Sequence, residues 1–469
     1  MALVFDIETN GLYPEVNTLW LIMTEDTITG EKKQYSDHDN ALPSIKEGLE
    51  ALSNADILVG HNICGYDIPV LEHLTGWKPN PATVIYDTWI MSQTLRYKRG
   101  HLHGLEGWGA KLGFPKIKFD DFSKYSQEML KYGIRDVELN VKVYHKLVEE
   151  AKSTIKINPL FKKGLWVEMR FGLIEAKIRH RGWRFNEPAA RALLADLEKQ
   201  MEEIEDEVNP QIGLVCMKVD KADEHKEPVY KKNGEYALST ARWFSIDPSD
   251  ALSNRTVDGP FSRVEFEQGR LSSDKVLKAW LYSIGWVPDD WNVKKVGRNF
   301  VQTSPKLTES SLEKLGPIGL RVSEYGTISN RHGVLNGWLK SIEYDGRLHG
   351  RMWTIGTPTF RCRHEVIANL PKVQTAKDGT PVKGLAGGFG YDMRSLLLPT
   401  EGWVVVGADS AGNQMRGLCH DIGDESFTNE VIAGDVHRRN ADVLVPYMKP
   451  NLTPKEERDT AKPFLYALN

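Results

Sequence analysis

Residues 6–11 read DIETNG, and they follow the apolar run Leu3–Phe5. The alternation predicts a strand in which Phe5 and Ile7 point into a core while Asp6 and Glu8 share the opposite face. Two acids in an apolar strand are costly unless cations compensate them. Two hard divalent ions bound by carboxylate oxygens would do so. The alternative is a solvated edge strand, which this motif by itself favours.

Two later stretches add to the acidic pair. The first, HNICGYD, follows a predicted strand at Ile57–Gly60 and ends in Asp67, where a helix begins. The second, YGIRD, puts Tyr132 four residues before Asp136, one helical turn away on the same face. Four carboxylates and a phenol are what two-metal hydrolysis of a phosphodiester requires. One ion activates water, the other stabilises the leaving oxygen, and the tyrosine aligns the water.

In order and spacing, DIETNG, HNICGYD and YGIRD resemble the three motifs of the DEDD 3′–5′ exonucleases, in the subgroup whose third motif carries tyrosine. The resemblance implies an α/β, ribonuclease-H-like proofreading domain over residues 1–155. It implies two Mg²⁺ ions, with Mn²⁺ as an alternative, held by Asp6, Glu8, Asp67 and Asp136 beside Tyr132. Asp87 also occupies a position where these domains carry an acid. We interpret it as a helix cap and leave it out of the metal set.

Beyond about residue 155 the pattern changes to long amphipathic helices. Asn186-Glu187-Pro188 is a good helix start, and the apolar stripe that follows it is typical of core packing. Residues 211–267 lose this periodicity and are predicted to be an insertion. Further elements are expected in the second half: helices at Ser273–Ile284 and Thr308–Leu315, a hairpin over Ile342–Trp353 turning at Asp345-Gly346, a buried strand at Trp403–Val406, and a capping box at Thr453–Glu456.

The C-terminal region carries a second group of polar residues. Asp409 ends the predicted strand, where it could hold a metal or cap the next helix, and the residues leave both interpretations open. Arg458, Lys462 and Tyr466 are spaced by four on a predicted helix, which suits a triphosphate and a sugar. The alternative is a solvated basic face.

The order of the segments resembles family A DNA polymerases, especially the replicative polymerases of short-tailed phages. The stretches SSDKVLKAWLYSIGWVP, GTPTFRCRHEVIANLP, VVVGADSAGNQMR, GDVHRRN and ERDTAKPFLY carry this resemblance. It implies a helical thumb over residues 156–210 and 268–340, with the insertion 211–267, and an α+β palm with incomplete fingers over 341–469. The implied roles are metal binding by Asp409 and the carbonyl of Ser410, phosphate binding by His437, Arg458 and Lys462, sensing of the sugar 3′ hydroxyl by Tyr466, and DNA contacts by Arg361, Asn369 and Arg394.

The chain departs from that family in three places. Gln414 stands where the family usually has a glutamate that excludes ribonucleotides. Pro463 falls inside the fingers helix, where it should produce a kink. The family's motif C, with its second metal-binding aspartate, is absent, so we expect a second polypeptide to complete the polymerase site. An interrupted gene, a spliced precursor and a fragment are alternatives that the sequence leaves open. The insertion lies where phage relatives grip a processivity factor.

The expected function is DNA replication, with single-stranded DNA, primer–template DNA and deoxynucleoside triphosphates as ligands. One alternative is an exonuclease whose polymerase remnant only holds DNA, and another is a structural subunit without catalysis. Composition agrees with a folded protein: 469 residues, 41% hydrophobic and 26% charged, suggest about three domains. The sequence shows neither a membrane span nor a disulfide or zinc spacing among its four cysteines, which predicts a cytoplasmic protein.

Overall fold

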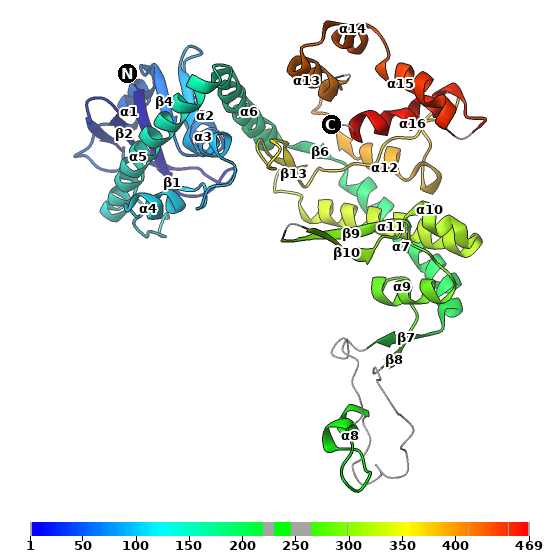
Figure 1. Ribbon diagram of the computed structural model, residues 1–469. Helices are drawn as coiled ribbons and strands as arrows, with labels where there is room; N and C mark the ends of the chain where they lie inside the picture. The colour runs from blue at the N-terminus through cyan, green and yellow to red at the C-terminus, as the bar shows by residue number, and fades with distance from the viewer. Residues whose placement is uncertain are drawn as a thin grey trace. The chain divides into compact units, whose positions relative to one another are not determined.

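The computed structural model describes residues 2–218, 229–244, 264–297, 299–410, 412–448 and 450–467. The chain divides into two compact units, Met1–Thr400 and Glu401–Asn469, which we describe separately. Figure 1 shows their elements along the chain.

A five-stranded sheet with the order β3-β2-β1-β4-β5 forms the centre of the N-terminal domain. The central strand β1 pairs antiparallel with β2 and parallel with β4, and β5 continues the parallel side. The strands are β1 (Ala2–Thr9), β2 (Leu19–Asp26), β3 (Lys32–Tyr35), β4 (Ile57–Gly60) and β5 (Val84–Asp87). The predicted strands at the first and second motifs are therefore confirmed.

Helices cover both faces of this sheet. Leu3, Phe5 and Ile7 pack into one buried cluster, whereas Val4 packs into a second cluster on the face that α5 crosses (Figure 1). This alternation places Asp6 and Glu8 on the face of α5, as a strand requires. The helices of this domain are α1 (Ile45–Ser53), α2 (Asp67–Thr75), α3 (Thr88–Leu95), α4 (Leu105–Leu112) and α5 (Gln127–Ile157).

The next helix, α6 (Phe161–Arg181), packs against the N-terminal domain. Met169 is buried with the side chains of the sheet, and its sulfur accepts the backbone N–H of Asp87 at 3.3 Å. At the other end of α6, the guanidinium of Arg179 donates to the carbonyl of Gly65.

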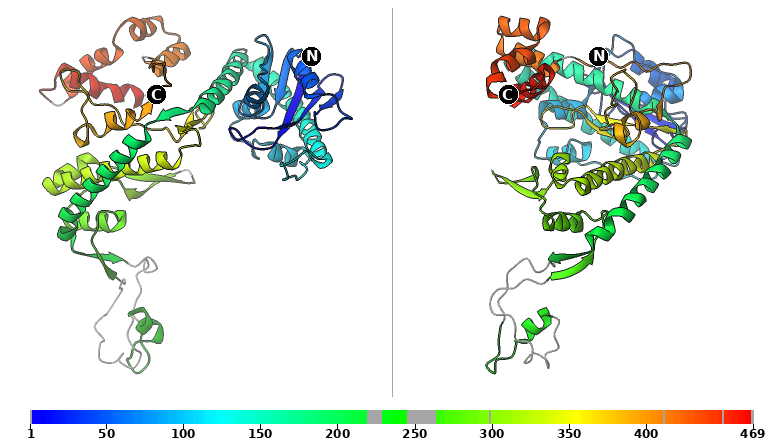
Figure 2. Two further views of the ribbon diagram at one scale, coloured as in Figure 1. Left: turned by 180° about the vertical axis from the view of Figure 1, so that it is seen from behind. Right: turned by 90° about the vertical axis from the view of Figure 1, so that its right-hand side faces the viewer.

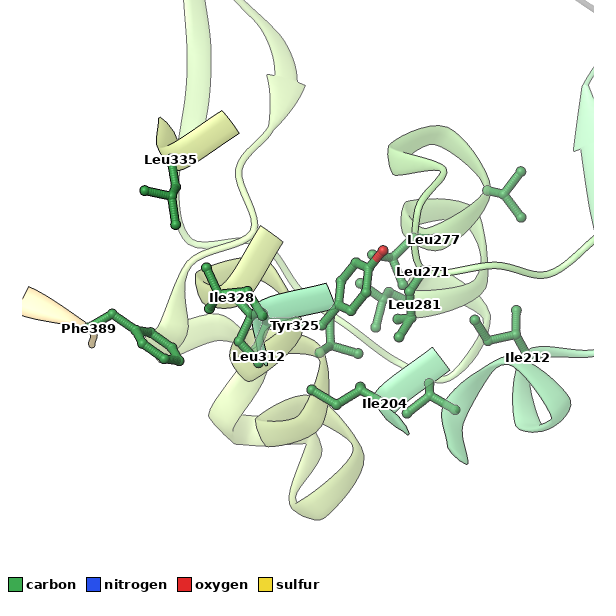
Figure 3. Close-up of a cluster of buried hydrophobic side chains, with 14 of the residues drawn as sticks. Ile204, Ile212, Leu271, Leu277, Leu281, Leu312, Tyr325, Ile328, Leu335 and Phe389 are labelled. Carbon is green, nitrogen blue, oxygen red and sulfur yellow. The ribbon is translucent and has the colours of Figure 1, made fainter. Parts of the chain in front are cut away.

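Long helices then build a second core. The start predicted at Asn186 is confirmed, because its side chain caps α7 (Glu187–Ile212) by accepting from the Ala189 N–H. The α7 stripe packs against α11 (Pro317–Lys340), and both views in Figure 2 show the two helices together. Figure 3 shows the cluster between them, in which Ile204 and Ile328 are almost completely buried. Shorter helices α9 (Asp274–Ser283), α10 (Glu309–Leu312) and η2 (Glu313–Leu315) close this core.

The described part of the insertion begins and ends in a strand pair. β7 (Leu214–Lys218) pairs antiparallel with β8 (Val264–Gln268), and a short helix, α8 (Leu238–Phe244), lies between them in the sequence. A second hairpin, β9 (Trp291–Val296) and β10 (Asn299–Pro305), follows α9 and was not predicted.

The hairpin predicted over Ile342–Trp353 is only partly present. The chain does turn at Asp345-Gly346, where the Gly346 N–H bonds to the Glu343 carbonyl. The strands after the turn, however, join different sheets: β11 (Arg347–Leu348) pairs with β6 (Trp183–Phe185), which also pairs with β14 (Leu397–Leu398), and β12 (Arg351–Trp353) pairs with β13 (Arg363–Glu365). The short helices η3 (Leu385–Gly387) and α12 (Gly390–Arg394) precede β14.

In the second unit, the predicted buried strand at Trp403–Val406 is wrong. These residues form no strand, and Val404 and Val406 are 80% and 84% exposed. A buried strand needs a neighbour to bond its backbone N–H and C=O groups, and no described strand pairs with this run. The helices of this unit are α13 (Asn413–Ile422), α14 (Glu425–Ala433), α15 (Val436–Leu444), η4 (Val445–Tyr447) and α16 (Pro454–Ala467). The predicted capping box is confirmed by reciprocal bonds between Thr453 and Glu456.

Two further expectations concern the described residues as a whole. None of their helices is long and apolar enough to cross a membrane. The four cysteines, Cys64, Cys216, Cys362 and Cys419, are free thiols.

Candidate active site in the N-terminal domain

The structure brings the residues of the three motifs to one open cavity of about 1130 Å³. Asp6 and Glu8 reach it from β1, Asp67 from the start of α2, and Tyr132 and Asp136 from α5. Glu8, Asp67 and Asp136 are buried, and Asp6 is half-buried. Residues up to 130 positions apart in sequence thus face the same space.

Asp67 is tied directly to the central strand. Its Oδ1 accepts the backbone N–H of Ile7 at 3.2 Å, and its negative charge contributes to raising the pKa of Asp6. The first two motifs are therefore in contact through backbone and side chain.

The turn between β4 and α2 owes its shape to small residues and to Asp87. A Cβ on Gly60 would lie 1.9 Å from the Ile63 side chain, so only glycine fits there. Asn62 has a positive φ of 65°, a conformation that asparagine tolerates. The Asp87 carboxylate accepts the N–H groups of Asn62 at 3.0 Å and Cys64 at 3.1 Å.

Asp87 is a helix cap, as predicted. It is the N-cap of α3, and its carboxylate also accepts the N–H groups of Trp89 and Ile90. Four backbone N–H groups donate to its two oxygens, which leaves them little capacity for a cation.

A glycine lets α5 approach β1. A Cβ on Gly133 would lie 2.4 Å from the Met23 methyl carbon and 3.0 Å from Glu8 Oε1. The glycine of the third motif therefore brings Tyr132 and Asp136 close to the acids of the first.

Sequence reasoning missed Lys116. Its ammonium lies 2.6 Å from Asp136 Oδ2 and donates to the Tyr132 hydroxyl at 3.0 Å. Lys116 belongs to a segment without helix or strand between α4 and α5, where no periodicity points to a site. In the sequence, Lys116 is only a lysine that follows a helix-ending glycine, Gly113. Such an arrangement is too common to predict a functional site.

Burial and the crowding of negative charge shift the pKa values of the groups in this site. Burial, followed by repulsion from neighbouring carboxylates, raises the pKa of Asp6 well above its ordinary value and raises the pKa of Glu8 to about 9. Burial also raises the pKa of Asp67 and of Asp136, with Lys116 opposing the shift at Asp136. Burial and the Asp136 carboxylate raise the pKa of the Tyr132 phenol to about 12, so the phenol is neutral at physiological pH.

Two buried oxygens in this cavity have no hydrogen-bond partner among the described residues: Glu8 Oε1 and Asp136 Oδ1. Buried carboxylate oxygens are normally satisfied, and hard divalent cations are their usual partners when no donor is present. The donor set therefore fits a divalent ion. Within the described ranges, however, no three His, Cys, Asp or Glu side chains are already arranged to hold a metal ion.

The predicted DNA-contact residues of the first unit are exposed. Arg361 and Asn369 lie on irregular segments around β13, and Asn369 has a positive φ of 51°. Arg394 donates to the carbonyls of Pro371 at 2.8 Å and Leu370 at 3.3 Å. The structure thus links Arg394 to the segment that carries Asn369, and their role in DNA binding remains a prediction.

In the second unit, α15 and α16 bring three predicted phosphate-binding residues together. His437 is buried, and the nearby charges of Arg458 and Lys462 contribute, after burial, to lowering the pKa of its imidazole. Arg458 also pairs with Asp435 at 2.7 Å.

Among the described side chains, those of Asp409, Ser410 and Gln414 do not join that cluster in any described contact. Asp409, Ser410 and Gln414 are exposed, the first two on an irregular segment and the third in the first turn of α13. Tyr466 lies in the last turn of α16, which continues past Pro463.

Comparison with known proteins agrees with this architecture. A family model of the RNase_H superfamily matches residues 3–120. The DNA-directed DNA polymerase of Escherichia phage T7 is 23% identical over 545 aligned positions, which cover 99% of this chain and 75% of the relative. The corresponding protein of Enterobacteria phage T3 is 24% identical over the same shares.

A solved structure is similar over the whole chain. The POL domain of Pol1 from M. smegmatis, in complex with DNA primer-template and dNTP, aligns with a TM-score of 0.60 and 14% identity. The alignment covers 100% of this chain and 67% of that chain. The predicted fold class, a ribonuclease-H-like α/β domain followed by a polymerase-like region, is confirmed.

Proposed function

We propose that this chain, a homologue of phage DNA-directed DNA polymerases with an RNase H-like exonuclease domain, hydrolyses DNA from the 3′ end and takes part in nucleotidyl transfer. Its ligands would be single-stranded DNA, primer–template DNA and deoxynucleoside triphosphates. The relatives support the class of reaction, and the site geometry supports the residue roles.

The observation that carries the hydrolytic function is the cavity shared by four carboxylates and Tyr132. Asp6, Glu8, Asp67 and Asp136 would hold divalent ions, Mg²⁺ or Mn²⁺, and the two unpartnered oxygens are available for this among the described residues. When bound, such ions supply an activated water and stabilise the leaving oxygen.

The protein's own groups would orient the reactants. The Tyr132 hydroxyl, neutral because its pKa is raised, can donate a hydrogen bond to a phosphate or accept one from the attacking water. Phe119 and Phe122 pack against the Tyr132 ring, with ring centroids 5.6 and 6.0 Å away, and limit its movement. Holding the phenol in one place is what alignment of an in-line attack needs.

Shortening of a 3′-labelled single strand tests this function. Wild-type chain with Mg²⁺ should shorten the strand, and the double substitution Asp6→Ala with Glu8→Ala should abolish the reaction. A matched control is Glu31→Ala with Glu47→Ala, two exposed acids of the same domain outside the cavity. Equal shortening by the cavity variant and the wild type would refute the role of this site.

The proposed contribution to nucleotidyl transfer rests on similarity over 99% of the chain and on the cations of α15 and α16. Arg458 and Lys462 would bind the phosphates of a deoxynucleoside triphosphate, with His437 beside them. Asp409 and the Ser410 carbonyl would bind a metal ion, and Tyr466 would lie near the sugar.

Direct binding of a deoxynucleoside triphosphate tests the phosphate role without requiring turnover. The double substitution Arg458→Ala with Lys462→Ala should weaken binding by about tenfold or more, since charge-assisted contacts to phosphate are lost. Arg439→Ala is the control, because this exposed arginine of α15 pairs with Glu430 instead. Unchanged affinity in the double variant would refute the assignment. The second polypeptide and the processivity factor expected from the resemblance stay predictions.

A further inference from the structure

Lys116 contacts two groups of the proposed hydrolytic site at the same time. Its Nζ pairs with Asp136 Oδ2 at 2.6 Å and donates to the Tyr132 hydroxyl at 3.0 Å, and it lies 5.0 Å from the centre of the Tyr132 ring. The Asp136 side chain is 5% exposed and that of Lys116 is 25% exposed, so the pair is largely shielded from water. A shielded pair of this kind is strongly destabilised when one partner is removed.

The cavity around this pair is rich in negative charge. Six acids line it: Asp6, Glu8, Asp67, Glu106, Asp120 and Asp136. Lys116 and Lys118 are its lysines, and Lys118 is exposed. Of these two described lysines, Lys116 is the one that contacts a buried carboxylate, and its positive charge lowers the pKa of Asp6, Glu8 and Asp136 against the effect of burial.

The segment that carries Lys116 is joined to the tyrosine by aromatic packing. Phe119 and Phe122 contact each other at 5.0 Å between ring centroids, and both contact Tyr132. The Phe122 carbonyl accepts the indole N–H of Trp20 at 3.0 Å, which anchors this segment to β2. A shift of the lysine backbone would therefore disturb the aromatic packing of Tyr132, whereas a rotation of the lysine side chain would break its contact with the Tyr132 hydroxyl and keep that packing.

An ammonium on Asp136 Oδ2 and a divalent ion on the same carboxylate repel each other by charge. The described acids are not yet arranged to hold a metal ion, although Glu8 Oε1 and Asp136 Oδ1 lack partners among the described residues. The first fact agrees with a lysine that occupies the place of one cation, and the second leaves two oxygens for an incoming ion.

We propose that Lys116 is a built-in counter-cation, which holds Tyr132 and Asp136 in place in the metal-free chain and gives up its contact with Asp136 when a divalent ion binds. The inference deepens the proposed function, on which it rests for the identity of the ion. Release requires only rotation of the flexible lysine side chain, so the aromatic packing around Tyr132 is kept. The freed ammonium then remains in the cavity, where it can contact a DNA phosphate.

Binding of Mn²⁺ to the EDTA-stripped full chain, measured by calorimetry without DNA, tests the inference. Lys116→Met removes the competing charge and keeps the length of the side chain, and it should tighten Mn²⁺ binding by about tenfold, which corresponds to about 1.4 kcal/mol. Lys116→Arg keeps the charge and should bind Mn²⁺ as the wild type does. Lys124→Met, an exposed lysine of the same segment outside the cavity, should change nothing.

Thermal unfolding gives a second readout. Without metal, Lys116→Met should unfold at a lower temperature than the wild type, and saturating Mn²⁺ should raise its unfolding temperature by more than it raises that of the wild type. Unchanged or weaker Mn²⁺ binding by a folded Lys116→Met chain would overturn the inference. If that variant does not fold, Lys116→Gln replaces it with the same expectation.

The outcomes separate this inference from the proposed function. Shortening of DNA by the wild type together with unchanged Mn²⁺ affinity in Lys116→Met would refute the counter-cation and leave the exonuclease in place. Tighter Mn²⁺ binding by Lys116→Met without shortening of DNA by the wild type would support the counter-cation and refute the exonuclease. Absence of Mn²⁺ binding by every variant would refute both.

Discussion

The carboxylate of Asp87 accepts the backbone N–H of Cys64 at 3.1 Å, so the cap of one helix also supports the turn that precedes another. The same carboxylate reaches Asn62, Trp89 and Ile90. Because the supported turn leads directly into Asp67, the position of a cavity acid depends on a residue that does not line the cavity.

Replacement of Asp87 should therefore affect both stability and the site. Asp87→Ala should lower the free energy of unfolding by roughly 2–4 kcal/mol, because buried N–H groups lose their acceptor together with a helix cap. Chemical denaturation of the full chain measures the loss. Asp424→Ala is the control: Asp424 caps α14 through the Phe427 N–H but is exposed, so its loss should be smaller. Equal losses would contradict the double role of Asp87.

A methyl group at Gly133 should disturb Glu8. The added Cβ would meet Glu8 Oε1 at 3.0 Å and the flexible Met23 side chain, so Gly133→Ala should slow DNA shortening by about tenfold or more through misplacement of one carboxylate. Gly164→Ala in α6 meets nothing within 4 Å. This control should keep wild-type activity and gain up to about 1 kcal/mol of stability from helix propensity. Wild-type rates in Gly133→Ala would show that α5 has room to move.

Removal of the Tyr132 hydroxyl should separate its role in aligning the reactants from the packing of its ring. Tyr132→Phe keeps the ring between Phe119 and Phe122 but loses the group that contacts Lys116. We expect kcat for DNA shortening to fall roughly 10²-fold, as for the loss of a positioned catalytic group, with KM and the unfolding temperature little changed. Tyr125→Phe is the matched control, since the Tyr125 hydroxyl bonds to Asp39 away from the cavity. An unchanged kcat in Tyr132→Phe would remove the phenol from the reaction.

His61 should make the free energy of unfolding depend on pH below about pH 6.5. Burial, with the nearby charges of Lys116 and His103, lowers the pKa of His61 to about 3. In the unfolded chain the imidazole takes up its proton near pH 6.5, as an unperturbed histidine does. The contribution of neutral His61 to stability is therefore complete above about pH 6.5 and is lost as the pH falls toward 3.

The comparison of two pH values checks this prediction. Between pH 7 and pH 5 the free energy of unfolding should fall more in the wild type than in His61→Gln, which has no proton to gain. Parallel losses in the two proteins would show that His61 keeps an ordinary pKa.

The elements that the sequence predicted well are those whose signals are local. The strand Ile57–Gly60 has the predicted bounds, and Asn186 begins α7 as its capping chemistry indicates. The acids of the first and third motifs meet because strand alternation and helical spacing fix the direction of their side chains. The predicted set Asp6, Glu8, Asp67, Tyr132 and Asp136 accordingly lines one cavity.

The features that escaped prediction depend on contacts between distant parts of the chain. Trp403–Val406 has the composition of a buried strand, but burial depends on a pairing partner that composition does not reveal. Lys116 reaches Asp136 from an irregular segment, whose course is decided by the packing of Phe119 and Phe122. Neither a hydrophobic period nor a turn signal contains this information.

The contacts of α6 bear on any attempt to isolate the nuclease. Met169 accepts the Asp87 N–H, and Arg179 binds the Gly65 carbonyl. A Cβ on Gly172 would lie 2.6 Å from the Ile90 side chain, so the glycine lets α6 approach α3 closely. A fragment that ends near residue 155 would lack α6. It would expose the apolar side chains that α6 covers, next to the turn that leads into Asp67. A fragment that extends through Arg181 would keep these contacts of α6. We expect it to be the shortest N-terminal fragment that survives purification.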